Sequence, residues 1–447
     1  KGLFMYKKLK FYLSLILARS AYLGIKLFSN SSGTSFAGKA VLKFYPEFLS
    51  HCGDYIKEKN ITISGTNGKT TTSGLVSHIL ETSGKSVIHN LKGANMLTGV
   101  ANVFALTLAP FKRFDYSVIE SDEAYLNKLY DYMKSDYLVV TNLFRDQLDR
   151  YGELATTASF IQKAIDKNPD LTLILNADDP LVTNLGKNRD KVIYYGFENV
   201  EYTYDIEKSN APTEVFNCTC GKPLEYSKQF FAQQGHYHCS CGFSRPKCDY
   251  SADVKVGMEY SILHVKHNEK SYEFTTHLVG LYNAYNALAA IAFAFENGIS
   301  AEIIQQALNS YHSIFGRTEQ RTINGHPTLI QLIKNPTGAS EVLKTVDLDS
   351  NIVIAINDNY ADGRDISWLW DSDFEQLKNA KKLVITSGIR ANDMATRLKY
   401  AGIPQDKIKI EPSIKKAIEL AVSANNNEHV TILPSYTALL KINKEKF

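Results

Sequence analysis

The stretch Ile61-Thr62-Ile63-Ser64-Gly65-Thr66-Asn67-Gly68-Lys69-Thr70-Thr71 decides the fold. A β-branched run leads into a glycine-rich turn, and an apolar pattern with helical spacing follows at Leu75, Val76, Ile79 and Leu80. This order of strand, turn and helix is typical of a phosphate loop. The glycines let backbone N–H groups close around phosphate oxygens, and the helix N-terminus adds positive potential. In such a loop Lys69 can reach the terminal phosphates and the Thr70 hydroxyl can bind Mg²⁺.

The composition is that of a large globular chain. With 447 residues, two or three domains are expected, and 44% hydrophobic residues can build substantial cores. The net charge of +3 is too small to indicate a nucleic-acid partner or an anionic membrane surface. The apolar stretch Phe11–Ala18 ends at Arg19, well short of a membrane-spanning helix, and no small-residue cleavage site follows it. We therefore predict an amphipathic helix there rather than a signal peptide.

Three regions follow one another along the chain. Residues 1–55 hold the N-terminal helix and a connection, residues 56–315 form a central domain, and residues 316–447 form a second, Rossmann-like α/β domain. Short strands alternate with helical patterns, which predicts mostly parallel sheets with crossover helices. The expected strands are 116–120, 137–141, 171–175, 352–356, 383–386 and 430–433, and helices are expected at 374–379 and 393–401. Residues about 200–275 are rich in Tyr, Cys, His and Lys, and we interpret them as an inserted antiparallel module.

Glu120 ends the expected strand 116–120, in the run Val-Ile-Glu-Ser-Asp-Glu. Ligand-binding groups gather at the carboxyl ends of strands in open α/β sheets, and a carboxylate there can hold Mg²⁺. An ordinary acidic loop explains Glu120 equally well when it is taken alone. The phosphate loop upstream favours the metal role.

Asn283 and Asn286 are three residues apart, so they share one face near the start of an expected helix. Amide side chains carry both donors and acceptors and can read an adenine edge. Capping and core packing are the simpler explanation when the pair is taken alone, since Asn is a good N-cap residue.

Four of the six cysteines form two short units, Cys218-Thr219-Cys220-Gly221 and Cys239-Ser240-Cys241-Gly242. Four thiolates satisfy tetrahedral Zn²⁺, so we predict a closed structural site of Cys218, Cys220, Cys239 and Cys241. The glycines allow tight turns that aim both sulfurs at one metal. His236, His238 and Cys248 are rival ligands, and unpaired buried thiols or redox chemistry are the less favoured alternatives. A disulfide framework is not expected in a large chain without a signal peptide, which indicates reducing cytosol.

Several blocks occur in the order found in the Mur ligases. These are Gly65–Thr70 with its short glycine spacing, Glu120, Thr141–Arg150, Asn176–Pro180, Asn283–Ala287 and Gly316–Glu319. From about residue 60 to 320 the chain therefore resembles the Mur ligases and the folylpolyglutamate synthases. The resemblance implies that ATP activates a carboxylate as an acyl phosphate, which an amine then attacks.

The same resemblance implies roles by position. ATP would be bound by Gly65, Thr66, Asn67, Gly68, Lys69, Thr70 and Thr71. Thr70 and Glu120 would bind Mg²⁺, and Asn286 would face adenine with Asn283 beside it. Arg317 would steady phosphate charge in the transition state.

Two departures point away from adding an amino acid. In the block Thr141–Arg150, Gln147 stands where ordinary Mur ligases carry a His. Gln331–Pro336 reads Gln-Leu-Ile-Lys-Asn-Pro, where their C-terminal domain opens with Asp-Tyr-Ala-His-Asn-Pro.

Nearly the full chain resembles the MurT family, the Mur-ligase-like subunits of lipid II isoglutaminyl synthase. The supporting blocks are Gly93–Met96, Asn142–Asp146, His236–Gly242 and Asn357–Trp368. The family works with GatD, a glutaminase that carries the Cys nucleophile and the His. The resemblance implies that this chain phosphorylates the α-carboxylate of D-glutamate in lipid II, and that ammonia from the partner then forms D-isoglutamine.

The block Asn357–Trp368 holds Asp358, Asp362 and Asp365 directly after an expected strand. From composition alone, a solvated acidic turn is the favoured interpretation. In the family, the Asp at the position of Asp365 orients the partner's His and completes a triad across the interface. A carboxylate can do this because it fixes the tautomer of the His and stabilises its charged form. This chain offers no convincing glutaminase nucleophile, so ammonia should come from another chain.

We thus expect a Mur-ligase-like central ATPase domain with an inserted zinc ribbon, acting with a GatD-like glutaminase and using ATP, Mg²⁺ and Zn²⁺. The expected location is the cytoplasm, peripheral to the membrane through the lipid-linked substrate. A stand-alone amino-acid ligase of the Mur or folylpolyglutamate type is the alternative. A non-enzymatic protein that binds ATP and zinc is the third possibility.

Overall fold

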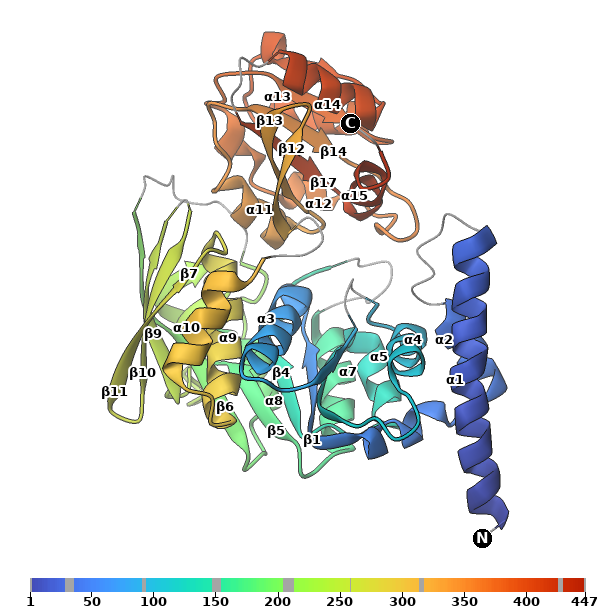
Figure 1. The fold of residues 1–447 in the computed structure, drawn as a ribbon. Helices are drawn as coiled ribbons and strands as arrows, with labels where there is room; N and C mark the ends of the chain where they lie inside the picture. Colours follow the sequence, from blue (N-terminus) through green and yellow to red (C-terminus); the bar gives the residue numbers. More distant parts are fainter. Residues whose placement is uncertain are drawn as a thin grey trace.

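The computed structural model describes residues 2–28, 36–90, 94–146, 154–203, 213–257, 259–312, 317–424 and 429–445. Within them the chain forms two α/β bodies and an N-terminal layer of two helices, α1 (Gly2–Phe28) and α2 (Phe36–Phe44) (Figure 1). Helix α1 contains the predicted segment Phe11–Ala18, whose Phe11, Leu15 and Ala18 are buried. In the described part of the chain, none of the helices combines the length and apolar character needed to cross a membrane.

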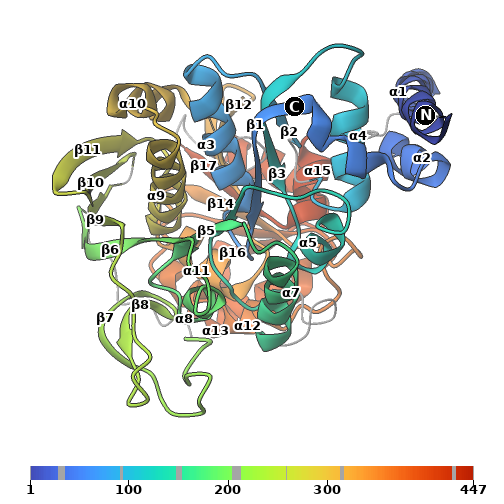
Figure 2. The same cartoon turned by 90° about the horizontal axis from the view of Figure 1, so that it is seen from below.

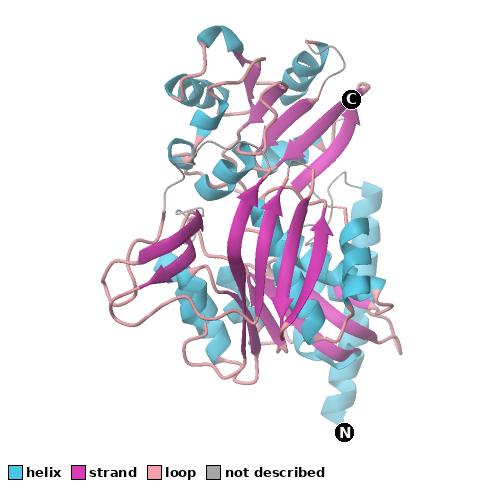
Figure 3. Ribbon diagram, turned by 90° about the vertical axis from the view of Figure 1, so that its left-hand side faces the viewer, coloured by secondary structure: helices cyan, strands magenta, loops and turns pink. Residues whose placement is uncertain are grey.

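A nine-stranded sheet forms the centre of the first body, in the order β11-β10-β9-β6-β5-β4-β1-β3-β2 (Figure 3). Pairing is parallel from β2 to β9 and antiparallel among β9, β10 and β11. The strands are β1 Ile56–Ser64, β2 Val87–His89, β3 Phe114–Glu120, β4 Tyr137–Val140, β5 Thr172–Asn176, β6 Val192–Tyr202, β9 Tyr250–Val256, β10 Ser261–His267 and β11 Lys270–Thr276. The strands expected at 116–120, 137–141 and 171–175 are therefore present as β3, β4 and β5.

Helices cover both faces of this sheet, which explains its near-continuous apolar strands. Along β4, Leu138 and Val140 join one core while Val139 joins the other. Figure 2 shows α3, α9 and α10 on one side and α5 and α7 on the other. Their bounds are α3 Lys69–Thr82, α9 Leu281–Glu296, α10 Ala301–Ser310, α4 Leu97–Thr107, α5 Glu123–Leu129, α7 Leu154–Asp166 and α8 Pro180–Leu185, and 3₁₀ turns lie at Phe48–His51 and Gly53–Tyr55.

The segment interpreted as one antiparallel module divides between two sheets. Strands β7 (Glu225–Phe231) and β8 (Gln234–His238) form a separate two-stranded sheet. Strands β9 to β11 instead extend the large sheet, because alternate residues of β9, from Tyr250 to Val256, are buried in the core under α9. Only β7 and β8 therefore form the separate antiparallel ribbon, and they are the shorter part of residues 200–275.

The second body is a six-stranded sheet in the order β12-β13-β17-β14-β15-β16, parallel except for the pair β12–β13. Its strands are β12 Arg317–Ile323, β13 His326–Gln331, β14 Asn351–Ala355, β15 Val384–Ser387, β16 Ile408–Ile410 and β17 Val430–Pro434. Its helices are α11 Pro336–Leu343, α12 Trp368–Asp371, α13 Ala391–Tyr400, α14 Ile414–Ser423 and α15 Tyr436–Ile442, with a 3₁₀ turn at Gln405–Lys407. The helix expected at 374–379 is a single 3₁₀ turn, Phe374–Leu377, whereas α13 matches the one expected at 393–401.

The two bodies meet where β1 and β4 end (Figure 1). Asn335 Nδ2 donates to Asn67 Oδ1 over 2.9 Å, and Arg145 forms an ion pair of 2.7 Å with Asp371. The Thr337 hydroxyl donates to Glu214 over 3.0 Å. The glycine-rich loop of residues 65–71 thus lies at the junction between the bodies.

Candidate active site and metal centre

The phosphate loop, residues 65–71, joins β1 to α3 and depends on two glycines. Gly65 has φ 118° and Gly68 has φ 85°, a region that L side chains rarely adopt. Space is equally restrictive, because a Cβ at Gly65 would lie 2.4 Å from Thr141 Oγ1 and one at Gly68 would lie 2.1 Å from Asn286 Oδ1. The first N–H groups of α3 have no partner within the helix, so the loop ends in donors suited to an anion.

Asn142, after β4, holds the loop from the neighbouring strand. Its carbonyl accepts from the Thr66 N–H over 2.9 Å, and its Oδ1 accepts from the Asn67 N–H over 2.8 Å. The sequence showed Asn142 only as part of a motif block. Its role as the clamp of the loop depends on β1 and β4 being neighbours in the sheet.

Lys69 lies buried beneath the loop with its ammonium directed at carbonyls and a carboxylate. It donates to the carbonyls of Gly65 and Thr66 and forms an ion pair of 3.1 Å with Glu123. Burial alone would lower the pKa of Lys69, but Glu123 and the neighbouring Asp122 outweigh it and raise that pKa. The loop therefore carries a fixed positive charge.

Glu123 is a residue of the candidate site that the sequence did not single out. It follows Asp122, whose carboxylate accepts from the Ala124 N–H over 3.1 Å and caps α5. The cap turns the chain so that Glu123 points into the site. The only signal in the sequence was a second acidic residue in the run Val-Ile-Glu-Ser-Asp-Glu.

Thr70 and Glu120 meet as expected for a magnesium site. The Thr70 hydroxyl donates to Glu120 Oε2 over 2.8 Å, and Asn95 Nδ2 lies 3.3 Å from Glu120 Oε1. Asn90 holds the backbone of Glu120, accepting from its N–H and donating to its carbonyl, each over 2.8 Å. A hydroxyl and a carboxylate oxygen side by side at strand ends are ligands that Mg²⁺ accepts.

The two asparagines of α9 lie on one face, as predicted, but only one reaches the loop. Asn286 Oδ1 accepts from the Thr72 hydroxyl over 3.3 Å, and Asn286 lines a cavity beside the loop. Asn283 lies behind it, accepting from Asn286 Nδ2 over 3.2 Å and donating to the Val279 carbonyl over 2.8 Å. Asn283 thus orients Asn286.

The cavity beside the loop lies between the two bodies, and its lining suits a nucleotide. Polar groups come from the loop and α9, and the aromatic rings of Phe231 and Tyr282 offer flat apolar surfaces. The second body closes it with Gln331, Leu332, Lys334, Gly338, Glu341 and Val342. Lys334 pairs with Asp146 and its Nζ lies 3.5 Å from the Thr66 carbonyl. The block that departs from ordinary Mur ligases therefore brings a second cation to the phosphate loop.

Three predicted positions lie partly or wholly outside the described residues. Arg317 begins β12 opposite Gln331, but its side chain is outside the described part. Gln147 and Arg150 are outside it altogether.

The three aspartates after β14 differ in their burial and in the groups that they bind. Asp358 is buried and pairs with Arg390, while Asp362 is buried and accepts from the Thr437 N–H of α15 over 2.7 Å. Asp365 is only partly buried and accepts from the Ser367 N–H over 2.8 Å. It lines a second cavity at the junction of the bodies, together with Trp368. Asp362 lines the same cavity, so Asp365 is distinguished from the other two aspartates by being the least buried.

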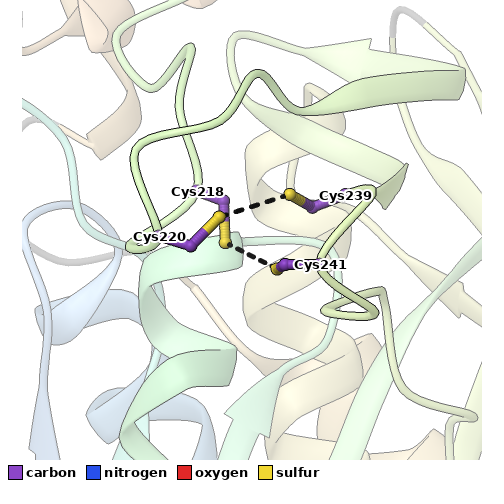
Figure 4. A group of neighbouring side chains, drawn as sticks. All are labelled: Cys218, Cys220, Cys239 and Cys241. Atoms are coloured by element: carbon purple, nitrogen blue, oxygen red, sulfur yellow. Dashed lines mark hydrogen bonds between the residues drawn. The ribbon is translucent and has the colours of Figure 1, made fainter.

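The four predicted zinc ligands come together in the two turns that flank β7 and β8, at the open end of this hairpin (Figure 4). Cys218 Sγ lies 3.7 Å from Cys241 Sγ, Cys220 Sγ lies 3.6 Å from Cys239 Sγ, and all four sulfurs lie within 4.8 Å of one another. Sulfurs bound at about 2.3 Å around a tetrahedral ion would be about 3.8 Å apart. Gly221 and Gly242, with φ of 85° and 94°, close the two turns. The donor set and its spacing fit a closed metal site.

The rival ligands lie elsewhere. His236 Nε2 is 2.7 Å from the Phe197 carbonyl, His238 is 3.2 Å from Glu225, and Cys248 accepts from Arg245 over 3.2 Å. Burial raises the pKa of the Cys248 thiol, which opposes a role as a thiolate ligand. All six cysteines lie in the described residues, and none of them forms a disulfide.

Known proteins are similar to this chain over most of its length. Family models described as MurT ligase C-terminal and Mur ligase middle domain match residues 332–439 and 63–226. The lipid II isoglutaminyl synthase (glutamine-hydrolyzing) subunit MurT of Staphylococcus aureus (strain COL) is 34% identical over 414 residues, covering 91% of each chain. The subunit of the same name from Streptococcus pneumoniae (strain ATCC BAA-255 / R6) is 33% identical over 444 residues, covering 97% of this chain and 96% of that protein.

The fold also matches a solved structure. A pseudomurein peptide ligase type C from Methanothermus fervidus superposes with a TM-score of 0.67 at 24% identity, covering 91% of this chain and 84% of that chain. The predicted Mur-ligase fold is confirmed, and a cysteine cluster is present where the zinc ribbon was expected.

Proposed function

The chain belongs to the MurT family, and from that premise we propose that it is the ATP-dependent subunit of a glutamine-hydrolysing lipid II isoglutaminyl synthase. It is a ligase that forms a C–N bond. Two features of the site support this activity: a phosphate loop with a buried cation beside a cavity, and a partly buried Asp365 that lines a second cavity on the second body.

The proposed reaction has two steps. The γ-phosphoryl group of ATP moves to the α-carboxylate of D-glutamate in the lipid II stem peptide, so that a P–O bond to the carboxylate forms and the bond to ADP breaks. Ammonia then attacks the acyl carbon, phosphate leaves and a proton is lost, which gives D-isoglutamine, ADP and phosphate. Lys69 would neutralise charge on the transferred group, since preorganised donors stabilise charge that develops in the transition state.

The remaining residues would bind and orient. Thr70 and Glu120 would hold Mg²⁺, which neutralises phosphate charge when bound. Asn286 would face adenine, the loop residues 65–71 would surround the phosphates, and Arg317 would reach them from β12. Lys334 and Asn335, from the second body, would close the cavity over the loop because they already contact it.

Ammonia would come from a GatD-like glutaminase docked at the second body. Asp365 would hold the catalytic His of that partner, so that the triad takes its Asp from this chain and its Cys and His from the partner. Lipid II is anchored in the membrane, so the reaction would take place at its cytoplasmic face.

The decisive experiment is reconstitution. Purified chain, its co-purified glutaminase, lipid II, Mg·ATP and glutamine should give lipid II in which one carboxyl group has become a carboxamide. This product is slightly lighter than the substrate, because NH₂ replaces OH, and mass spectrometry detects it. Omitting the glutaminase should stop the glutamine-dependent reaction while ammonium salts still support it. If the single chain instead joins a free amino acid to its substrate, it is the alternative stand-alone ligase, and the proposal fails.

The cysteine cluster should bind about one Zn²⁺ per chain, a proposal supported by the sulfur spacing. Replacing Cys239 by Ser should release the metal and lower the melting temperature by roughly 5–10 °C, because zinc binding to the folded chain contributes directly to stability. Amidation at low temperature should change little, since a closed site leaves no position for substrate. Cys248→Ser is the matched control and should keep its zinc. A metal analysis that finds no zinc in chelator-free protein would contradict the proposal.

Glu123 should stabilise the empty site by holding Lys69. Replacing Glu123 by Gln leaves a buried ammonium without its counter-charge, which costs about 3–5 kcal/mol for a pair of this kind. A nucleotide supplies negative charge, so a non-hydrolysable ATP analogue with Mg²⁺ should raise the melting temperature more in the variant than in the native chain. Glu58→Gln, which breaks the exposed pair with Lys85, is the control and should cost less than about 1 kcal/mol. If the analogue raises the melting temperature of the variant and of the native chain equally, Glu123 does not have this role.

A further inference from the structure

Helix α1 has two apolar faces, and only one is used by the fold. Phe11, Leu15 and Ala18 are buried against the rest of the chain, with Phe11 stacked on Phe48 at 5.0 Å. The opposite face carries an apolar stripe that is between 43% and 70% exposed and consists of Met5, Leu9, Leu13, Ile16 and Leu23. At about 100° per residue these side chains fall within roughly 80° of one another, on the side of the helix away from the buried face.

The charges of α1 are all of one sign. Its 27 residues contain five Lys or Arg residues and no Asp or Glu. On the same helical projection Lys8 and Arg19 lie at one edge of the apolar stripe and Lys10 lies toward the other. An apolar stripe with cations along its edges is the pattern of a helix that lies in the interface of an anionic bilayer.

A second exposed element adjoins α1. The loop after α4 presents Phe111, which is 98% exposed, followed by the exposed Lys112 and Arg113. Phe111 has φ 68°, in the left-handed region that a bulky residue rarely adopts. Arg19 of α1 donates to the Leu108 carbonyl, which fixes this loop beside the helix. The exposed ring of Phe111 next to two cations combines apolar and positive groups, as the stripe of α1 does.

We propose that α1 lies flat on an anionic phospholipid surface, with the apolar stripe among the acyl chains and Lys8, Lys10 and Arg19 at the headgroup phosphates. A second copy of this chain would meet cations with cations along the helix, so like charges oppose that occupant. An anionic bilayer complements both the stripe and its edges. The whole-chain net charge of +3 hides this concentration of charge in one helix.

The position of α1 gives such docking a use that rests on the proposed function. Helix α1 packs on α4, and α4 begins just after Asn95, whose amide contacts Glu120. Gly38 of α2 lets the layers approach closely, since a Cβ there would lie 1.9 Å from the Thr98 carbonyl. The proposed magnesium site is therefore one packed helix away from the docking surface, where a lipid-linked substrate would be held.

Vesicle sedimentation tests the proposal without lipid II or ATP. The full chain should sediment with phosphatidylcholine vesicles that contain phosphatidylglycerol, weakly with phosphatidylcholine alone, and less as salt is raised. The double variant Leu9→Glu, Ile16→Glu should bind at least about tenfold more weakly. The double variant Ile410→Glu, Leu420→Glu removes two exposed aliphatic side chains of the second body and adds the same charge, and it should bind like the native chain. Circular dichroism melting checks that both variants are folded.

Three outcomes would overturn the proposal. These are no sedimentation of the native chain with anionic vesicles, equal binding by both double variants, and a self-association broken by the α1 variant without any vesicle binding. The proposed enzymatic function is tested separately with detergent-solubilised lipid II, on which the α1 variant should be as active as the native chain. Vesicle binding without amidation would refute the function and leave the docking surface standing.

Discussion

Replacing Lys69 by Ala should reduce ATP-dependent amidation by at least about 10²-fold, because it removes the fixed positive charge of the phosphate loop. The ammonium is buried under the loop and already contacts the carbonyls of Gly65 and Thr66. Lys334 cannot replace it, since its charge is paired with Asp146 and it approaches the loop from the other body. Formation of ADP and amidated lipid II in the reconstituted complex measures the effect.

Controls separate the loss of a charge from the loss of the fold. Lys69→Ala leaves Glu123 buried and unpaired, so the double variant Lys69→Ala, Glu123→Gln should recover stability without recovering activity. Lys85→Ala, at an exposed pair in the same body, should stay fully active. Glutamine hydrolysis by the partner should continue in every variant. Amidation at the native rate by Lys69→Ala would show that the loop has another purpose.

The parallel strands and the phosphate loop could be predicted from sequence because their signals are local. Strands buried on both faces are continuous apolar runs, and the loop has its glycines at fixed spacing. The ribbon cysteines are also local, since each Cys-x-Cys-Gly unit forms its own turn. Local patterns do not show which sheet a strand joins, so β9 to β11 were assigned to the ribbon module although they extend the large sheet.

The missed parts of the site depend on contacts between distant residues. Asn335 and Asn67 are 268 positions apart, and no periodicity links them. Asn142 can bind the phosphate loop only because β4 lies beside β1 in the sheet. The exposed face of α1 was missed for another reason: net charge was summed over the whole chain, whereas a membrane surface would meet a single helix.

Replacing Asp365 by Asn should lower glutamine hydrolysis in the complex by about 10⁴-fold, the cost of the same exchange in the serine-protease triad. The amide keeps the shape and the bond from the Ser367 N–H, but it cannot stabilise a charged His on the partner. The complex should still assemble. Nucleotide binding should be unchanged, because Asp365 does not line the cavity beside the phosphate loop.

Adding ammonium salts shows whether Asp365→Asn has lost only its supply of ammonia. At high concentration they should restore amidation in Asp365→Asn, whereas they should not restore it in Lys69→Ala. Asp349→Asn, at an exposed pair with Lys381 in the same body, is the matched control and should hydrolyse glutamine normally. Asp362→Asn should lower stability rather than chemistry, because Asp362 caps α15. If Asp365→Asn hydrolyses glutamine at the native rate, no triad crosses the interface through this residue. Asp358 could take this role only after its ion pair with Arg390 had been broken.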